Sequence, residues 1–500
     1  MALDRIRHLG LRDKVVSAAQ AAALIQDGMN VGISGFALAG NPKDVLPALV
    51  KEMEQSGAEK KINLWTGAST SYEVDGVLGA HNVVMRRFPY QSSREMRQCL
   101  NKGEVQYTDM HLSLSPQSVR YGWWGHLDVA IIEAAAVTES GEIVLTTAVG
   151  NTPTFAEAAD VIILEVNGTF PEGLEGFHDL YTPEDPPSRG PIPLTVPDQR
   201  IGQHTLKVPM DKIQAVVLSQ TKEKGPVFAK VEEVHERIAG HLIEFLEQEI
   251  QLGRMPPTLL PMQSGVGNVA NAVLAGLAHS RFENLQVYSE VLQDSILTLL
   301  ESGKLTVASG CAINLSDEAM EKLYENLDWF KERIILRPLE ISNHPELIRR
   351  LGIISMNTAL EADIYGNVNS THVMGSRMMN GIGGSGDFTR NAYISFFFTE
   401  STAKQGAISS IVPYVSHTDH TEHDVGVLIT EQGAADLRGL SPRERAVRII
   451  DKCAHPDYRA PLHDYFQRAC NQVGGQTPHL LEESFSWHHR FLQHGTMKQE

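Results

Sequence analysis

Glu290 is the carboxylate in this sequence whose surroundings most favour chemistry. It lies in the stretch LQVYSEVLQD (285–294), where Leu285 and Val287 alternate with polar neighbours as in a strand. From Val291 onward, the apolar residues recur at helical spacing. Glu290 is therefore predicted to lie where a strand passes into a helix, the place where open α/β sheets bind ligands. A carboxylate there could be a nucleophile, a base or a metal ligand, or only a first-turn residue that favours the helix dipole.

Two glycine-rich stretches could bring backbone N–H groups close to a ligand. Ser264–Asn268 (SGVGN) opens a predicted helix, and the run from Met379 to Phe388 holds four glycines within six residues. Successive N–H groups of this kind can bind a phosphate or a developing oxyanion. Neither stretch has the spacing of a Walker loop or of a dinucleotide fingerprint. The structural alternatives are a tight turn for the first and a flexible loop for the second.

Three histidines recur at three-residue steps in SHTDHTEHD (416–424), namely His417, His420 and His423. On a helix they would align, which is the arrangement that favours a metal site. Apolar strand-like runs flank the stretch, however, so we predict a loop, and no HExxH pattern is present. We therefore expect no metal there, and histidines that hydrogen-bond within the fold or line a pocket.

Two further polar residues have structural explanations as well as chemical ones. Cys311, in VASGCAINLS, could be a nucleophile, but its apolar neighbours favour an inert buried thiol. Asn343 stands just before a predicted helix, where capping is the default role of an asparagine. No G-x-S-x-G elbow indicates a serine hydrolase.

The elements that would position these residues alternate between strands and helices, which predicts an α/β fold with largely parallel sheets. In the first half, strands are predicted within 29–36, 61–70, 105–108, 129–133, 142–147, 161–165 and 213–218. In the second half, they are predicted within 285–287, 305–309, 333–337, 352–358, 408–412 and 425–430. Both halves offer a glycine turn, then a helix, then a strand, which indicates two related α/β halves with a boundary near residue 225.

One long segment interrupts this alternation. Residues 167–208 are rich in proline, glycine and acidic residues and show little periodicity. We predict an excursion over the surface, as a lid or an interdomain contact. Its aromatic residues and leucines argue against a disordered linker. The last 45 residues, with a helix predicted over 461–470, are expected to form a terminal cap.

Bulk properties exclude several classes of protein. The 500 residues are 42% hydrophobic and 21% charged, which is typical of a soluble globular protein with more than one domain. The formal net charge of -18 argues against nucleic acid or an anionic membrane as the main partner. The four cysteines are scattered without a CxxC pair, and neither a signal peptide nor a membrane-length apolar run is present. We expect a cytoplasmic protein.

Several long motifs together resemble the acetyl-CoA hydrolase/transferase family of class I CoA-transferases, in particular its succinyl-CoA:acetate CoA-transferases. The motifs are QSGVGNVANAV, VYSEVLQDS, RPLEISNHPELIRRLG, DIYGNVNSTHVMGSRMMNGIGGSGDFTRNAYIS and TEQGAADLRGLSP, with SGFALAGNPK and PYQSS in the first half. The resemblance implies two similar open α/β domains, 1–225 and 226–500, with the active site at their interface. It also implies a homodimer.

The same resemblance implies roles for particular residues. Glu290 matches the nucleophile of the YSEVLQ motif, Asn343 an auxiliary active-site asparagine, and Glu431 a pocket residue. The implied CoA contacts are Gly265, Val266, Gly267, Asn268, Val269, Gly384 and Lys404. Coenzyme A then enters as a substrate and covalent intermediate. No tightly bound cofactor, metal, nucleic acid or membrane partner is expected.

The implied reaction follows from carboxylate chemistry. A glutamate with its ordinary pKa of about 4.3 is ionised and attacks without a general base. It would form a mixed anhydride with the acyl group and then a glutamyl-CoA thioester, which a second carboxylate converts to the new acyl-CoA. The N–H groups of Val266 and Gly384 are the expected oxyanion donors, each typically worth ~2.7–4 kcal/mol.

Succinyl-CoA and acetate are the expected substrate pair, with propionyl-CoA:succinate transfer as an alternative. Acetyl-CoA hydrolysis is a second alternative, because water reaching the same intermediates would hydrolyse them. A non-catalytic CoA-binding regulator is the remote alternative.

Overall fold

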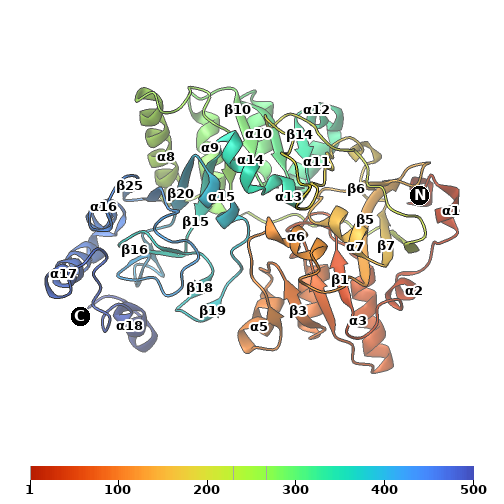
Figure 1. Ribbon diagram of the computed structural model, residues 1–500, viewed down its shortest axis with the longest axis horizontal. Coiled ribbons are helices and arrows are strands. Elements are labelled where there is room, and N and C mark those ends of the chain that lie inside the picture. The colour runs from red at the N-terminus through yellow and green to blue at the C-terminus, as the bar shows by residue number, and fades with distance from the viewer. Residues whose placement is uncertain (1, 229, 266, 500) are drawn as a thin grey trace. The chain divides into compact units, whose positions relative to one another are not determined.

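The computed structural model describes residues 2–228, 230–265 and 267–499 (Figure 1). The chain divides into two compact units. The first consists of Met1–Val227, Gln286–Glu301 and Leu305–Leu351, and the second of Phe228–Leu285, Ser302–Lys304 and Gly352–Glu500. The domain division predicted from the sequence, 1–225 and 226–500, stays a prediction.

The main sheet of the first unit has the strand order β4-β3-β2-β1-β5-β7-β8, with β6 paired to β5. Every neighbouring pair along this order is parallel, and β6 alone is antiparallel to its partner. The bounds are β1 (Asn30–Ile33), β2 (Ile62–Trp65), β3 (Val84–Phe88), β4 (Gln106–Tyr107), β5 (Val129–Val137), β6 (Ile143–Leu145), β7 (Val161–Asn167) and β8 (Ile213–Ser219). The predicted α/β class with largely parallel sheets is confirmed.

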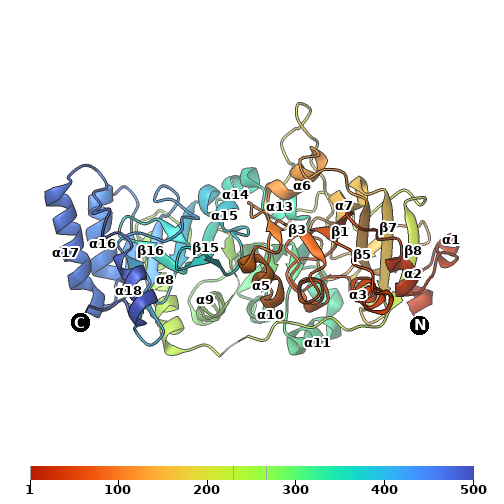
Figure 2. The same ribbon diagram turned by 90° about the horizontal axis from the view of Figure 1, so that it is seen from below.

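Helices cover both faces of this sheet. Val31 and Ile33 of β1 pack into one apolar core with Leu46 and Leu49, while Gly32 between them lies against Phe155 on the opposite face. Figure 2 shows α2, α3 and α5 along the first face and α6 and α7 near the other. The helices of this part are α1 (Leu9–Arg12), α2 (Ala18–Ala22), α3 (Val45–Ser56), α4 (Val77–Ala80), α5 (Arg94–Lys102), α6 (Leu114–Arg120) and α7 (Thr152–Ala158), with short turns at Ala2–Arg5, Tyr72–Gly76 and Glu172–Leu174.

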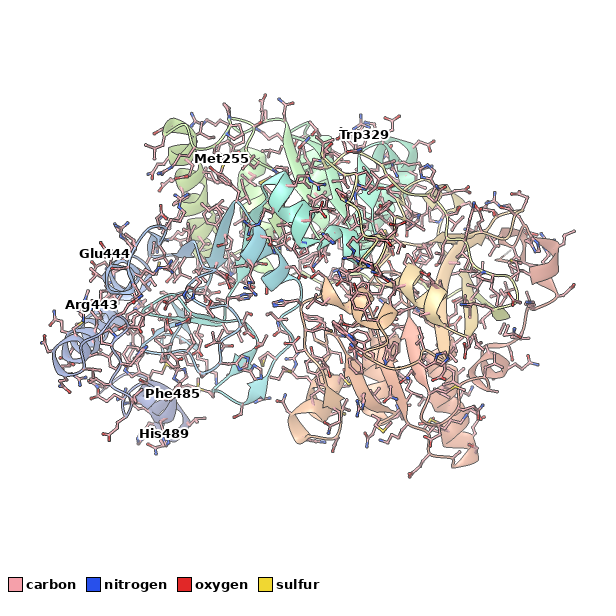
Figure 3. All side chains as sticks on the ribbon, in the orientation of Figure 1. Met255, Trp329, Arg443, Glu444, Phe485 and His489 are labelled. Carbon is pink, nitrogen blue, oxygen red and sulfur yellow. The ribbon has the colours of Figure 1, made fainter. Side chains whose placement is uncertain are left out.

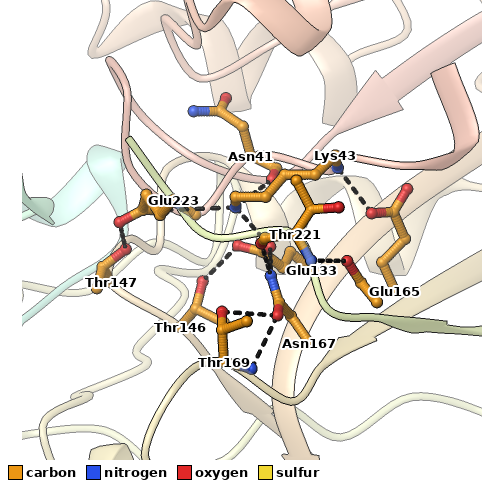
Figure 4. A network of polar contacts seen from close by, with 12 residues as sticks. Asn41, Lys43, Glu133, Thr146, Thr147, Glu165, Asn167, Thr169, Thr221 and Glu223 are labelled. Atoms are coloured by element: carbon orange, nitrogen blue, oxygen red, sulfur yellow. Dashed lines mark hydrogen bonds and ion pairs between the residues drawn. The ribbon is translucent and has the colours of Figure 1, made fainter. Parts of the chain in front are cut away.

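A buried ionic network crosses the carboxyl-end side of the sheet (Figure 4). The ammonium of Lys43 lies 2.6 Å from a carboxylate oxygen of Glu133 and 3.6 Å from one of Glu223. Burial raises the pKa of Glu133 to about 7, against the opposing effect of Lys43. Glu223 also accepts the N–H of Gly40 at 2.6 Å. The network therefore fastens the segment after β8 to the loop after β1.

The later segments of the first unit carry β10 (Leu285–Tyr288) from its second residue onward, β11 (Val291–Leu292), β12 (Leu305–Gly310), β13 (Ala312–Ile313) and β14 (Ile334–Leu336). β12 pairs in parallel with β14, and β11 with β13. The helices are α10 (Asp294–Glu301), α11 (Asp317–Glu325), α12 (Leu327–Lys331), α13 (Leu339–Ser342) and α14 (Pro345–Leu351).

Residues 167–208 belong to the first unit, and most of residues 181–200 are exposed or half-buried, as an excursion over the surface predicts. The prediction is wrong for the stretch around His178. His178 and Asp179 are fully buried. His178 forms a parallel bridge with Leu336 of β14, and the Asp179 N–H donates to the Leu336 carbonyl at 2.8 Å. Sheet pairing with a distant strand thus buries a segment whose composition alone indicates a surface loop.

The second unit is built on β9 (Met262–Ser264), β15 (Ile354–Thr358), β20 (Ile394–Phe398) and β24 (Val427–Thr430) in that order, all parallel, with β25 (Gly433–Asp436) antiparallel to β24. The small strands are β16 (Glu361–Asp363), β17 (Val368–Asn369), β18 (His372–Val373), β19 (Arg377–Met378), β21 (Thr402–Ala403), β22 (Ile408–Ser409) and β23 (Ile411–Val412). The strand predicted over 408–412 is therefore two short strands outside the main sheet.

The helices of the second unit are α8 (Glu233–Gln251), α9 (Asn268–His279), α15 (Ser385–Asn391), α16 (Pro442–Cys453), α17 (Pro456–Gln472) and α18 (Ser486–His494). α16 begins with a capping box, in which Ser441 and Glu444 satisfy each other's backbone N–H groups. α18 buries Trp487 and exposes His489, and Phe485 just before the helix is also exposed (Figure 3). Within the described ranges, no helix has the length and apolar character needed to cross a membrane.

Candidate active site

Glu290 lies between β10 and β11, so its predicted position just after a strand is confirmed. The alternative of a first-turn helical residue is wrong, because α10 begins only at Asp294. Val291 and Leu292, which the spacing assigns to a helix, form β11 and pair with Ala312 and Ile313 of β13.

The backbone of Glu290 is held by the turn between β12 and β13. Its carbonyl accepts hydrogen bonds from the N–H of Cys311 at 2.6 Å and of Ala312 at 3.1 Å. The N–H of the preceding Ser289 donates to the carbonyl of Ser309 at 2.9 Å. Glu290 itself is half-buried. Main-chain contacts therefore fix the backbone from which the Glu290 side chain extends.

Asn343 contacts the Glu290 carboxylate directly. Its Nδ2 donates to Oε1 of Glu290 at 2.6 Å, and the asparagine is fully buried. A hydrogen bond to an ionised carboxylate is about twice as strong as a neutral one. The capping role predicted for this position belongs to the next residue, since Nδ1 of His344 accepts the N–H of Glu346 at 3.2 Å. Asn343 instead orients the carboxylate.

The helix that presents Asn343, α13, is anchored at two points. The hydroxyl of Tyr288 donates to the Ile341 carbonyl at 2.5 Å. Arg120 of α6 makes two hydrogen bonds to the carboxylate of Glu340, at 2.6 and 2.8 Å. Its Nε also donates to Asp185 at 3.0 Å. Bidentate pairs of this kind add geometric specificity as well as energy.

A second buried arginine joins segment 167–208 to the same region. Arg337, just after β14, forms a buried ion pair with Asp179 and donates to Ser309 Oγ at 2.8 Å. It also donates to the carbonyls of Pro197 at 3.0 Å and Gln199 at 2.7 Å. Segment 167–208 thus supports the strand ends that carry Glu290.

Loops after β1, β2 and β6 complete the surroundings of Glu290. The N–H of Gly150 donates to Cys311 Sγ at 3.2 Å, and the Gly150 carbonyl accepts the N–H of Leu339 at 3.0 Å. Burial, with the charge of Glu290, raises the pKa of the Cys311 thiol well above its ordinary value, which agrees with an inert thiol. One apolar cluster unites Phe36, Ala39, Ala68, Leu112, Ala148, Val291, Cys311, Ala312 and Leu339.

The predicted CoA-binding turns belong to the second unit. Gly265 follows β9, and its N–H donates to the carbonyl of Met356 at 2.9 Å. Gly384 is the residue before α15. Val266 lies outside the described residues, as does the side chain of Asn268, whose backbone opens α9 ahead of Val269.

A chain of buried amides connects these two turns. Gln263 of β9 donates to Oδ1 of Asn357 on β15 at 3.2 Å, and Asn357 donates to the hydroxyl of Thr389 on α15 at 3.3 Å. β9 and β15 run parallel, so the turn after β9 leaves from the edge at which β15 ends. The structure therefore places both turns at the carboxyl edge of one sheet.

Lys404 and Glu431 also belong to the second unit. Lys404 is exposed in the turn between β21 and β22, with its ammonium 4.8 Å from the centre of the Phe491 ring. Glu431 follows β24 and accepts the N–H of Ser401 at 2.8 Å and Nε2 of Gln432 at 2.9 Å. Burial acts to raise the pKa of Glu431, but these hydrogen bonds outweigh it and hold the pKa below its ordinary value.

The three spaced histidines lie in a loop, as predicted, and have separate environments. His417 is 3.4 Å from Asp419, and His423 is exposed with its ring 3.3 Å from the hydroxyl of Thr421. His420 is buried and contacts Ser385. Among the residues that the structure describes, no group of three or more histidines, cysteines and acidic residues is arranged to hold a metal ion.

The chain as a whole matches known proteins. The N-terminal domain of the acetyl-CoA hydrolase/transferase family matches residues 5–217, and its C-terminal domain matches residues 320–466. The succinyl-CoA:acetate CoA-transferase of Clostridium kluyveri is 53% identical over 494 residues, which cover 99% of this chain and 92% of that protein. The acetyl-CoA hydrolase of Candida glabrata is 44% identical over 514 residues, with coverage of 99% and 97%.

The chain belongs to the acetyl-CoA hydrolase/transferase family and is an enzyme of the CoA-transferase group. The crystal structure of RipA from Yersinia pestis has the same fold, with a TM-score of 0.72 and 21% identity over 93% of this chain and 99% of that one. The family resemblance predicted from the motifs is confirmed, and the family's substrates are CoA thioesters.

Proposed function

We propose that this enzyme transfers CoA from succinyl-CoA to acetate, with Glu290 as the covalent nucleophile. The observation that carries the choice of nucleophile is the hydrogen bond of 2.6 Å between Asn343 Nδ2 and Glu290 Oε1, which orients the carboxylate. We assign the attack to the other carboxylate oxygen, Oε2. The relative from Clostridium kluyveri that is 53% identical is named for this pair of substrates.

The reaction needs no general base, because every nucleophile in it is already an anion. Oε2 of Glu290 attacks the succinyl carbonyl, the C–S bond breaks, and CoA leaves as a thiolate from a mixed anhydride. The thiolate then attacks the Glu290 carbonyl and releases succinate, which forms the glutamyl-CoA thioester. Acetate attacks that thioester and expels the thiolate, which finally takes the acetyl group and frees the carboxylate. Each attack is a nucleophilic substitution at an acyl carbon.

Asn343 has two roles in this sequence. In the resting enzyme its amide fixes the rotation of the carboxylate. When the Glu290 carbonyl is attacked, Oε1 becomes the oxyanion, and the same N–H group is already in place to stabilise it. We assign the oxyanion of the substrate carbonyl to the N–H groups of Gly384 and Val266.

The remaining assignments keep the roles that the motifs imply. Gly265, Gly267, Asn268, Val269 and Lys404 would contact CoA, and the hydrogen-bonded carboxylate of Glu431 would lie in the substrate pocket. A cytoplasmic homodimer is part of the proposal and rests on the family resemblance and the scattered cysteines. Light scattering after size-exclusion chromatography tests the oligomeric state.

Acetyl-CoA hydrolysis is the second candidate function, because the relative from Candida glabrata carries that name at 44% identity. The two functions differ in whether water or a carboxylate resolves the glutamyl intermediates. Initial rates of acyl-CoA loss separate them. Transfer predicts ping-pong kinetics that require the acceptor carboxylate. Equal rates with and without acetate would favour hydrolysis.

Intact-protein mass spectrometry after mixing with succinyl-CoA tests the nucleophile. We expect an adduct of the mass of CoA on the wild-type protein and none on Glu290→Gln, which keeps the size of the side chain. Glu283→Gln is the matched control, because Glu283 is an exposed glutamate shortly before β10. An adduct that persists in Glu290→Gln would contradict the assignment.

A further inference from the structure

A serine and a histidine distant in sequence meet beside the second glycine turn. Ser385 is the first residue of α15, directly after Gly384. Its Oγ lies 3.0 Å from Nε2 of His420 and 2.7 Å from the carbonyl of Ile382. The serine hydroxyl therefore links the histidine to the turn that contains Gly384.

His420 is itself held in place. It is 1% exposed, and its backbone forms an antiparallel bridge with Val368 of β17. The centre of its ring lies 4.8 Å from that of Phe397 on β20. The ring therefore has little freedom to rotate, and its Nε2 stays within hydrogen-bond distance of the Ser385 hydroxyl.

The hydrogen-bond directions follow from the chemistry of a hydroxyl. The carbonyl of Ile382 can only accept, so the Ser385 hydroxyl donates its proton to it. The serine oxygen then accepts from Nε2–H of His420. This places the proton of His420 on Nε2 and makes a directed chain from His420 through Ser385 to Ile382.

We propose that His420 is a positioning residue that acts through the Ser385 hydroxyl to fix the direction of the Gly384 N–H. The inference rests on the proposed function, in which Gly384 stabilises the oxyanion of the substrate. The hydroxyl closes the three-residue turn Ile382–Gly384, so its loss frees the peptide that carries the Gly384 N–H group. An oxyanion donor acts only when it is aimed at the position that the charge will occupy.

Steady-state kinetics of Ser385→Ala, His420→Leu and His420→Gln test this role. We expect kcat to fall about tenfold to about 100-fold in the first two, less than the roughly 10²–10³-fold typical when a donor is lost outright. KM for acyl-CoA should stay within about threefold, since binding of the distant part of CoA does not depend on one oxyanion donor. His420→Gln retains an N–H donor near Nε2 and should recover most of kcat.

His423→Ala is the matched control, because His423 is an exposed histidine of the same loop, and it should keep wild-type kinetics. Thermal unfolding of each variant separates positioning from folding. A fall in melting temperature with unchanged kcat would show a structural role only and overturn the inference. So would equal losses of kcat in His420→Leu and His420→Gln. A wild-type protein without transferase activity would overturn the proposed function as well.

Discussion

Replacing Asn343 by alanine tests the arrangement around Glu290 most directly. The change removes the amide donor 2.6 Å from Oε1 of Glu290 and leaves the anchors of α13 at Glu340 and Ile341 in place. The carboxylate then loses the contact that sets its rotation. It also loses the donor that would stabilise the oxyanion on its own carbonyl during thioester formation and breakdown.

The size of the effect follows from the strength of this bond. A hydrogen bond to a charged group contributes about 1.5–3 kcal/mol. If the whole of this is expressed in the transition state, kcat falls by about tenfold to about 150-fold. The loss belongs in kcat rather than KM, because the bond strengthens as charge develops on Oε1.

The assay is the rate at which the CoA adduct appears on the protein in a single turnover, followed by mass spectrometry. Ser342→Ala is the matched control, because Ser342 is a buried neighbour on α13 whose hydroxyl has no hydrogen-bond partner among the described residues. Its removal should be nearly neutral. An Asn343→Ala protein with a rate within about twofold of the wild type would refute this account of the site, since a factor of two is only about 0.4 kcal/mol.

Three further predictions concern the support of the site. Gly150→Ala should destabilise the protein far more than Gly122→Ala in thermal unfolding. Both glycines have positive φ, where alanine costs roughly 1–2 kcal/mol. Only at Gly150 would the added carbon also clash with the backbone. Burial lowers the pKa of His178 from its ordinary 6.5 to about 4, so the native state excludes a proton that the unfolded chain binds. The contribution of His178 to the free energy of unfolding should therefore fall by about 3 kcal/mol as pH drops from 6.5 to 4. Urea titrations of the wild type and of His178→Gln should show it as a difference between the two pH dependences, because raised carboxyl pKa values such as that of Glu133 act in the opposite direction in both proteins. Glu340→Gln should lower stability in the same titrations by up to ~3–5 kcal/mol, since it removes a buried partner of Arg120.

The strands that could be predicted are those whose own residues carry the signal. Every residue of β5 is buried, and its apolar run, interrupted by Glu133 alone, indicates a central parallel strand. β3 was not predicted from the sequence, because its residues VMRRF include a charged side chain, Arg87, at a buried position. The buried guanidinium of Arg87 is neutralised by Asp75 at 2.8 Å and also donates to Thr66 Oγ1 at 3.0 Å and to the Ser69 carbonyl at 2.6 Å. A local pattern cannot show a compensating charge supplied by another segment.

The candidate site also combines features that the local sequence predicts with contacts that depend on distant residues. The alternation of Leu285 and Val287 predicts the strand end at Glu290, whereas the pairing of Val291 with β13 depends on residues some twenty positions away. The hydrogen bond from Asn343 to Glu290 spans 53 positions. Locally, Asn343 has only the character of a capping residue. The active-site role of Asn343 was predicted from the family motif, and the structure adds its hydrogen bond to Glu290.

The buried ion pairs around α13 have their main value in geometry. Replacing such a pair by apolar residues of similar volume is often neutral for stability, because desolvation offsets the attraction between the charges. The two hydrogen bonds between Arg120 and Glu340 nevertheless hold the guanidinium plane and the carboxylate plane in one orientation. Apolar packing imposes no such orientation. Glu340 lies on α13 and Asn343 ends it, so the anchoring of Glu340 by Arg120 also limits movement of the helix end that carries Asn343. Replacing the whole pair should therefore change rate more than stability, whereas removing Glu340 alone also costs stability because the charge of Arg120 stays buried.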